Sequence, residues 1–157
     1  KATQYKRRTM VMKSLKIKRL NENAIQPERA SAGAAGMDLH ACIPSPVTIA
    51  PRELVRIPTG LAIALPDENT VALIFARSGL GIKHGVSLSN AVGVIDSDYR
   101  GEICVGLCNV GGEPYTIEPN ERIAQMVLMP VLNLPLEETD DLGETERGAG
   151  GFGSTGR

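Results

Sequence analysis

Residues 93–101, Gly-Val-Ile-Asp-Ser-Asp-Tyr-Arg-Gly, place two carboxylates and a phenol within nine residues. Apolar residues lead into this stretch and alternate after it, so we predict two strands joined by a tight polar turn. The glycines at its ends would let the main chain approach a flat ligand closely, because no β-carbon stands in the way. Asp96 is the candidate for a group that abstracts a proton. Asp and Ser also form turns by bonding their own backbone, so this stretch alone leaves both interpretations open.

Two other stretches have residue types that could bind phosphate. Residues 76–79, Ala-Arg-Ser-Gly, put a guanidinium and a hydroxyl before a predicted helix, with a glycine that permits close approach. Residues 147–156 combine an Arg, glycine-rich backbone, Phe152 and two hydroxyls, which suits a polyphosphate and the face of a base. Taken singly, a loop Arg is more often a surface ion-pair partner, and a tail of this composition is often unstructured.

Other known sites do not fit the sequence. Gly148, Gly150 and Gly153 have the spacing of a dinucleotide fingerprint, but no strand precedes them and too few residues follow for a helix. A Walker-type loop would need a Lys after its last glycine. Cys104 and Cys108 would share one face of a strand, and with only two histidines in the chain their spacing is poor for zinc. Buried free thiols are therefore predicted.

Asp38 and Gln125 each allow two interpretations. Asp38 follows a stretch of small residues and could form a turn or contact a metal ion through water. Gln125 lies in a predicted strand whose Ile123, Val127 and Met129 would face inward. Gln125 shares that side, so it is either a polar residue of the core or a side chain that points into a pocket.

Prolines and turn signals divide the chain into short elements. Prolines at 44, 46, 51, 58 and 66 exclude a helix over this region. Strands are predicted over residues 14–20, 47–49, 54–57, 61–65, 71–75, 86–88, 93–96, 102–109, 115–117 and 122–130. One short helix is predicted over residues 78–84, with Gly85 at its end. The predicted fold class is all-β, a jelly-roll-like β-barrel with one short helix.

Composition limits the class of protein. A length of 157 residues fits one domain, and 42% hydrophobic but only 3% aromatic residues predict an aliphatic core. No apolar run approaches the length of a membrane span. Three cysteines, an odd number, without a recognisable signal peptide predict free thiols in a reducing compartment, and we expect the cytoplasm.

The net charge of −1 hides an uneven distribution. The first 20 residues hold eight of the 17 basic residues and none of the 18 acids, which leaves nine basic and eighteen acidic residues, a net charge of −9, in residues 21–157. So acidic a body predicts no nucleic-acid partner, and no membrane partner is predicted either. Residues 1–12 are interpreted as a basic N-terminal extension, native or added with a vector. Residues 13–136 form the predicted core, and residues 137–157 an acidic linker and Gly-rich arm.

Taken together and in order, five stretches resemble the five motifs of the trimeric deoxyuridine triphosphatases (dUTPases). They are residues 35–39 (Ala-Gly-Met-Asp-Leu), 76–80 (Ala-Arg-Ser-Gly-Leu), 93–101, 122–127 (Arg-Ile-Ala-Gln-Met-Val) and 147–156. The resemblance spans residues 13–157. One departure is Asn120, where the family usually has Gly before the acidic residue and Arg of the fourth motif. Asn tolerates positive φ, so the turn is expected to be preserved.

The resemblance implies a jelly-roll homotrimer in which all three subunits contribute to each active site and the C-terminal arm is exchanged between subunits. It implies hydrolysis of dUTP to dUMP and pyrophosphate, with Mg²⁺ bound by the triphosphate. This reaction keeps uracil out of DNA and supplies dUMP for thymidylate synthesis.

The resemblance also implies roles, position by position. Asp96 would be the general base that activates water for in-line attack on the α-phosphorus, Gln125 would help to hold that water, and Asp38 would reach the metal through its waters. Tyr99 would lie under the sugar and exclude a ribose 2′-hydroxyl, and the main chain of the predicted hairpin would read uracil. The other implied substrate-binding residues are Arg77, Ser78 and Gly79 at the phosphates; Asn90, Gly93, Val94, Ile95 and Cys104 at the base; and Arg147, Phe152, Gly153, Ser154 and Thr155 in the closing arm.

Two alternatives stay open at this point. The related dCTP deaminases carry a catalytic Glu ten positions after the Asp of the third motif, where this chain has Gly106, and they typically differ at residues 97–99 as well. A non-catalytic β-trimer that binds a nucleotide is the other alternative, although Asp96, Gln125 and Arg147 are all present. Pyrophosphate release from dUTP, dCTP and UTP would separate the three.

Overall fold

The computed structural model describes residues 14–151, and within this range it contains eleven β-strands and one α-helix. The elements in chain order are β1 (Lys16–Arg19), β2 (Met37–His40), β3 (Val47–Ile49), β4 (Leu54–Pro58), β5 (Leu61–Ala64), β6 (Thr70–Phe75), α1 (Ser78–His84), β7 (Val86–Leu88), β8 (Gly93–Ile95), β9 (Cys104–Asn109), β10 (Tyr115–Ile117) and β11 (Arg122–Pro130). The predicted extension at residues 1–12 lies outside the described residues.

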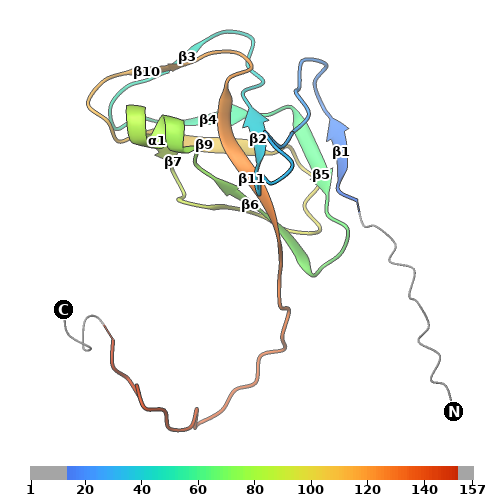
Figure 1. The fold of residues 1–157 in the computed structure, drawn as a ribbon, viewed down its shortest axis with the longest axis vertical. Coiled ribbons are helices and arrows are strands. Elements are labelled where there is room, and N and C mark those ends of the chain that lie inside the picture. The colour runs from blue at the N-terminus through green and yellow to red at the C-terminus, as the bar shows by residue number, and fades with distance from the viewer. Residues whose placement is uncertain (1–13, 152–157) are drawn as a thin grey trace, which may run out of the picture.

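The strands form four antiparallel sheets, with the orders β1-β5, β10-β3, β2-β11-β6-β8 and β4-β9-β7. They wrap around one interior, with α1 against β7 at one side, and the chain after β11 runs away from the barrel (Figure 1). The predicted all-β, jelly-roll-like fold with one short helix is confirmed.

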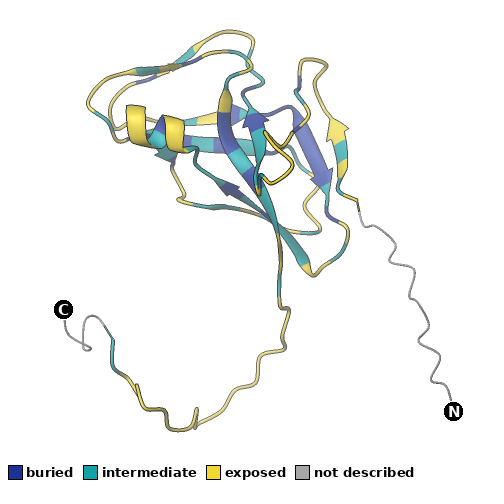
Figure 2. Ribbon diagram, viewed as in Figure 1, coloured by how far each residue is buried: buried dark blue, intermediate teal, exposed yellow. Residues whose placement is uncertain are grey.

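The core is aliphatic, as the composition predicts. Among the described residues, the buried hydrophobic side chains are all Ala, Val, Leu, Ile or Met. Figure 2 shows them concentrated on the inner strands, while α1 and the segment after β11 are largely exposed. The polar Asn109 is also fully buried, and its amide bonds the carbonyls of Ile49 and Glu113 and the N–H of Gly111. Its hydrogen-bonding groups are thus paired, as burial requires.

The strand pair predicted around residues 93–101 is wrong. Tyr99 donates its N–H to the Asp96 carbonyl at 3.2 Å, so the tight turn exists. However, β8 pairs with β6, whereas β9 pairs with β4 and β7. The turn therefore carries the chain from one sheet to another, and a space opens between the two sheets.

The prediction of which β11 side chains face inward is wrong for the second half of the strand. Ile123 is buried, but Ala124 and Met126 are buried as well, and Met129 is 43% exposed. The register of β11 against β2 shifts between Arg122 and Ala124, which marks a β-bulge. A bulge changes which residues face inward, so Gln125 lies on the outer face of the barrel wall, half-buried.

Two backbone positions behave as predicted. Gly85 ends α1 with φ 70°, and a β-carbon there would lie 2.5 Å from the Gly111 nitrogen. Asn120 adopts φ 66°, so the turn before β11 is preserved without glycine. No helix among residues 14–151 is long and apolar enough to cross a membrane.

Tyr115 ties β10 to the turn before β11, and its titration gives a testable pH dependence. Its hydroxyl donates to Glu121 Oε1 at 2.6 Å. Burial, followed by the hydrogen bond and charge of Glu121, raises the pKa of Tyr115 to about 12 from 10.0. The folded protein therefore holds this proton more tightly than the unfolded chain, so the stabilisation is complete below pH 10 and is lost as the pH rises towards about 12.

Tyr115→Phe is expected to lower the free energy of unfolding by about 1 kcal/mol at neutral pH, because the hydrogen bond is lost. The difference in the free energy of unfolding between variant and parent should become smaller above pH 10. Urea unfolding at pH 7.5 and at alkaline pH measures both effects. A gap of constant size across that range would show that the Tyr115 proton does not stabilise the fold.

Candidate active site

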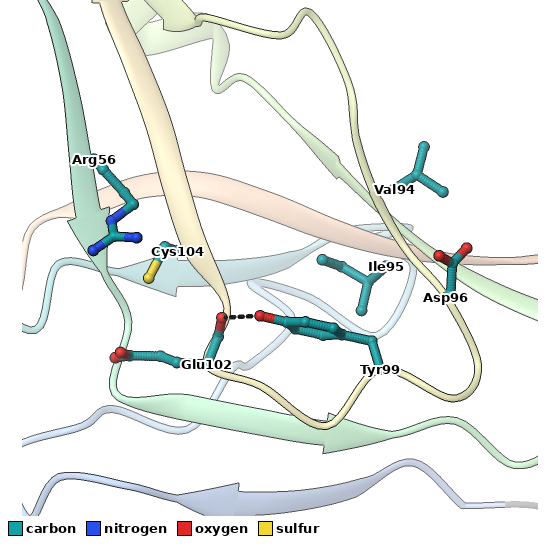
Figure 3. Close-up of a pocket in the computed structure, with 7 residues that line it drawn as sticks. All are labelled: Arg56, Val94, Ile95, Asp96, Tyr99, Glu102 and Cys104. Carbon is teal, nitrogen blue, oxygen red and sulfur yellow. Dashed lines mark hydrogen bonds between the residues drawn. The ribbon is translucent and has the colours of Figure 1, made fainter.

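A cavity of about 350 Å³ opens between the sheet of β8 and the sheet of β9 (Figure 3). Asp96, immediately after β8, lines it together with Val94 and Ile95 on one side and Cys104 at the start of β9 on the other. The apolar side chains of Val94 and Ile95 and the carboxylate of Asp96 thus face the same space. This combination can hold a flat, apolar ring with an acid–base group nearby.

Tyr99 forms the floor of this cavity. Its hydroxyl donates to the Glu102 carbonyl at 3.0 Å, which fixes the ring between the turn and β9 (Figure 3). A β-carbon at Gly101 would lie 2.6 Å from the Tyr99 Cζ. Glycine at position 101 is therefore required for the tyrosine ring to lie back across the loop.

Cys104 is not suited to act as a nucleophile here. Burial raises the pKa of the Cys104 thiol, and the negative charge of Glu102 raises it further, while Arg56 opposes the effect. The thiol is thus held in its protonated form at neutral pH. All three cysteines, including Cys42 and Cys108, are free, as predicted, but each is half-buried and none is buried as expected.

A second cavity, of about 370 Å³, lies where β2, β6 and β11 meet. Asp38 on β2 accepts a hydrogen bond from Arg77 Nε at 3.0 Å and lies 3.3 Å from Arg122 NH1. Arg77 also donates to the Arg122 carbonyl at 3.1 Å. Ser78 lines the same cavity. Two guanidinium groups and a hydroxyl on one cavity form a site for phosphate, and Asp38 orients both guanidinium groups.

Gln125 is held in this second cavity by its neighbours on both sides. Its backbone pairs with Asp38 of β2 and Phe75 of β6, and its side-chain amide donates to the Ala76 carbonyl at 3.0 Å. A β-carbon at Gly36 would lie 2.6 Å from Gln125 Oε1. The amide is thus fixed between a carbonyl and a glycine that leaves just enough room for it.

His40 lies on β2, two residues after Asp38, and contributes no positive charge to this cavity. Its Nδ1 is buried without a hydrogen-bond partner among the described residues. Burial lowers the pKa of His40; Asp38 opposes this shift, and the positive charge of Arg122 adds to it. The imidazole is therefore neutral at pH 7, and the two arginines supply the charge.

The two cavities are far apart in one chain. They share no lining residue. Asp96 follows Ile95, which pairs with Ala72 near the start of β6, whereas Arg77 comes after Phe75 at the other end. At 3.3 Å per residue this offset along β6 is about 15 to 20 Å. One chain therefore does not bring the carboxylate of Asp96 to the phosphate-binding groups.

A family model described as dUTPase matches residues 22–156 of the chain. The chain belongs to the dUTPase family. The deoxyuridine 5′-triphosphate nucleotidohydrolase of Hahella chejuensis is 52% identical over 139 residues, which cover 88% of this dUTPase and 91% of the relative. The enzyme of the same name from Desulfitobacterium hafniense is 51% identical over 149 residues, or 92% and 99% of the two chains. The family and enzyme class predicted from five ordered stretches are confirmed.

Solved structures agree with this assignment. The dUTPase of Staphylococcus bacteriophage 80alpha, in a mutant form with dUpNHpp, matches this dUTPase with a TM-score of 0.84 at 28% identity, over 93% of this chain and 100% of the other. A mutant dUTPase from phage phi11 of S. aureus, described with a structural Mg(II) ion, matches with a TM-score of 0.74 at 26% identity, over 82% and 98% of the chains.

The dUTPase fold gathers most of the sequence-predicted site residues, though not all of them. Val94, Ile95, Asp96, Tyr99 and Cys104 line the first cavity, and Asp38, Arg77, Ser78 and Gln125 line the second. Asn90, Gly93 and Gly79 line neither. Arg147 lies in the extended tail, where its Nε donates to the Gly150 carbonyl at 2.9 Å. Phe152, Gly153, Ser154 and Thr155 lie outside the described residues.

Three charged residues of the two cavities were missed from the sequence. Arg56 and Glu102 line the first cavity and Arg122 lines the second. Arg122 could have been found, since it opens the fourth motif. Arg56 reaches the cavity only because β4 pairs with β9, and no local pattern reveals that pairing. Glu102 directly follows the third motif, so it could have been found there.

The donor groups of this dUTPase fit a metal ion carried by the substrate. Among residues 14–151 no group of three or more His, Cys, Asp or Glu side chains is placed to hold a metal ion. Asp38 is the acidic side chain that lines the second cavity. Mg²⁺ usually keeps several waters and is bound by one or two carboxylates together with substrate phosphates. Asp38 fits such an arrangement.

Proposed function

We propose that this chain hydrolyses dUTP to dUMP and pyrophosphate by attack of a water molecule on the α-phosphorus. The observation that carries the proposal is the position of Asp96: in a dUTPase-family chain, its carboxylate directly follows β8 and lines a cavity that fits a nucleobase. Such a reaction needs an oriented base, cationic groups on the phosphates and exclusion of the wrong nucleotides.

Asp96 acts as the general base in this proposal. It stands at the end of β8, where the Tyr99 N–H bond to its carbonyl fixes the main chain. Its carboxylate takes a proton from the attacking water. The amide of Gln125, fixed against Ala76, helps to orient that water, and Arg77, Ser78 and Gly79 bind the phosphates.

Mg²⁺ is the proposed cofactor. When bound to the triphosphate, it neutralises phosphate charge and so favours attack by water. Asp38 is the residue that would hold the ion, through water. Arg77 and Arg122 hold the Asp38 carboxylate in place, so its position does not depend on the nucleotide.

The active form is proposed to be a homotrimer. The first cavity, lined by Asp96, would hold the base and is named the base cavity; the second, lined by Arg77, would hold the phosphates and is named the phosphate cavity. In one chain these two cavities are about 15 to 20 Å apart along β6. A single dUTP must reach both, so the two cavities that serve one substrate come from different chains. A third chain contributes the arm.

The extended tail supports exchange of this arm. Leu132, Leu134 and Leu136 alternate in a strand-like pattern after β11, yet all three are exposed. Figure 1 shows this segment leaving the barrel. An extended segment with exposed apolar side chains is stabilised by another surface, and a neighbouring subunit would supply one. We propose residues 13–136 as the core and 137–157 as the arm, with Arg147, Gly153, Ser154 and Thr155 closing on the phosphates and Phe152 on uracil.

The assay that tests the proposed function compares pyrophosphate release from dUTP, dCTP and UTP. Rapid release from dUTP alone is expected. Release of ammonia from dCTP would instead identify a deaminase, and binding of dUTP without turnover would identify a non-catalytic nucleotide-binding protein. We place the enzyme in the cytoplasm, where its free thiols would stay reduced.

Tyr99→Ala is expected to weaken discrimination against UTP, because the ring under the sugar would no longer clash with a 2′-hydroxyl. We expect the ratio of kcat/KM for dUTP to that for UTP to fall by about tenfold or more. Tyr99→Phe is the matched control, since it keeps the ring and removes the bond to the Glu102 carbonyl. Unchanged discrimination in Tyr99→Ala would refute the steric account of sugar selection.

Gly36→Ala is expected to displace Gln125. The added β-carbon would lie 2.6 Å from Gln125 Oε1, so the amide must leave its bond to Ala76. Misplacement of a group that orients the attacking water should lower kcat by about tenfold. Gly33→Ala is the control, because a β-carbon there has open space in the same loop. Equal rates for the two variants would remove Gln125 from the mechanism.

A further inference from the structure

The chain segment that leads into β2 forms one wall of the phosphate cavity. Four small residues of this segment line the cavity: Ala30, Ala34, Ala35 and Gly36. None of them has a polar side chain, so only their main-chain groups can form hydrogen bonds with a ligand there. What this wall can bind therefore depends on which main-chain groups face the cavity.

Packing of side chains does not hold this segment in shape. None of residues 28–36 is buried, and Figure 2 shows the chain before β2 as largely exposed. The two ends of the segment are joined by an antiparallel bridge, in which the Asp38 N–H donates to the Glu28 carbonyl at 2.9 Å. The bridge closes a loop of small residues with few apolar contacts, so the conformation of the loop depends on hydrogen bonds within it.

Arg29 makes two of these hydrogen bonds. Its NH1 donates to the Ala34 carbonyl at 2.6 Å and to the Ala35 carbonyl at 2.5 Å. The NH1 nitrogen carries two hydrogens, so one guanidinium group holds both carbonyls at once. Arg29 itself does not line the phosphate cavity. Both carbonyls are therefore held by a group that lies outside the cavity.

The orientation of these carbonyls determines the orientation of the next two N–H groups. No peptide bond of the described residues is cis, and in a trans peptide the C=O and N–H point in opposite directions. The Ala34 carbonyl shares its peptide with the Ala35 N–H, and the Ala35 carbonyl shares its peptide with the Gly36 N–H. Both N–H groups therefore point away from Arg29, and no residue within 14–151 accepts a hydrogen bond from either. Successive main-chain N–H groups of this kind bind anions.

We propose that Arg29 is a positioning residue for the triphosphate. By holding the carbonyls of Ala34 and Ala35, it presents the N–H groups of Ala35 and Gly36 to a phosphate oxygen. The inference rests on the proposed function, in which this cavity binds the phosphates. Without the guanidinium group both peptides can rotate, and a carbonyl oxygen turned into the cavity would repel the phosphates. Arg29 thus acts through the main chain and does not contact the substrate.

Three ligands separate this wall from the rest of the active site. Tripolyphosphate probes the phosphate cavity, deoxyuridine probes the base cavity, and dUpNHpp probes both. For Arg29→Gln we expect the Kd of tripolyphosphate and of dUpNHpp, measured by calorimetry, to rise about tenfold, because hydrogen bonds to a charged ligand are lost. The Kd of deoxyuridine should stay within about twofold of the parent, since the base cavity is distant from the loop.

Arg29→Lys separates positioning from charge. Lysine keeps the positive charge but lacks the planar guanidinium that holds both carbonyls, so its Kd for tripolyphosphate should lie between those of the parent and Arg29→Gln. Arg19→Gln is the matched control, because it removes an exposed arginine of β1 that does not line the cavity, and it should keep the parental values. Thermal unfolding of each variant identifies a loss of fold, and Arg29→Lys is sufficient if Arg29→Gln does not fold.

NMR spectroscopy of the amide protons tests the N–H groups directly. In the parent, tripolyphosphate should move the amide proton resonances of Ala35 and Gly36 downfield, as hydrogen bonds to phosphate form. The resonance of Gly33 should stay in place, because Gly33 belongs to the same loop but does not line the cavity. In Arg29→Gln, the changes at Ala35 and Gly36 should be smaller than in the parent at the same degree of saturation.

Four results would overturn the inference. They are a parental Kd for tripolyphosphate in Arg29→Gln, a parental Kd in Arg29→Lys, which would leave charge as the whole effect, an equal rise in the Kd of deoxyuridine, and unmoved Ala35 and Gly36 amides in the parent. Absence of dUTP hydrolysis by the parent would instead refute the proposed function, and tripolyphosphate binding would still test the role of Arg29.

Discussion

Asp96→Asn is expected to lower kcat for dUTP hydrolysis by about 10²- to 10⁴-fold, the usual contribution of a general base. The amide has the shape of the carboxylate but cannot take a proton from water. Asp96 lines the base cavity at the end of β8, and its main-chain position is fixed by the turn to Tyr99. The substitution should therefore leave the cavity intact. Pyrophosphate release measures the rate, and calorimetric binding of dUpNHpp measures the site, with a Kd expected to stay within a few-fold of the parent.

Asp98→Asn is the matched control for this experiment. Asp98 lies in the same turn but does not line the base cavity; it lines a neighbouring cavity that Asp96 also borders. We expect it to change kcat by less than tenfold. A parental rate in Asp96→Asn, or a larger loss in Asp98→Asn, would show that Asp96 is not the base. Equal loss of binding and rate in Asp96→Asn would assign it to substrate binding instead.

Features that depend on nearby residues could be predicted from the sequence. Closely spaced prolines limit elements to a few residues, and apolar alternation identifies strands, so ten of the eleven strands were expected. Gly85 and Asn120 were predicted correctly because Gly and Asn adopt positive φ more readily than other residues. The strand β2 was missed, since small residues precede it and its stability comes from pairing with distant β11.

Features that depend on distant pairing could not be predicted. Alternation shows that residues 93–95 and 104–109 are strands, but it does not show which strands they pair with. These two strands do not form the expected hairpin, because the chain passes from one sheet to another between them. Arg56 reaches the base cavity through the pairing of β4 with β9, so it carries no signal in the local sequence. The bulge in β11 similarly altered the facing of Met126 and Met129, because one extra residue shifts the alternation.

Because the two cavities of one chain are separated, we predict that two inactive variants of the chain restore activity when they form mixed trimers. Asp96→Asn removes the proposed base, and Arg77→Gln removes a proposed phosphate ligand that also contacts Asp38. Each variant alone should be almost inactive. If each site takes Asp96 from one chain and Arg77 from another, a mixed trimer contains some intact sites. In such a site an Arg77→Gln chain supplies Asp96, and an Asp96→Asn chain supplies the Arg77 guanidinium.

Refolding the two variants together in equal amounts should restore activity in about one quarter of the sites, because each site draws independently on two chains of a symmetric trimer. Pyrophosphate release after co-refolding, compared with the variants refolded separately and then mixed, measures this recovery. The double variant Asp96→Asn/Arg77→Gln, co-refolded with the parent, is the control. If each chain held a complete site, no mixture of the two single variants could recover activity, and the absence of recovery in verified mixed trimers would refute the shared site.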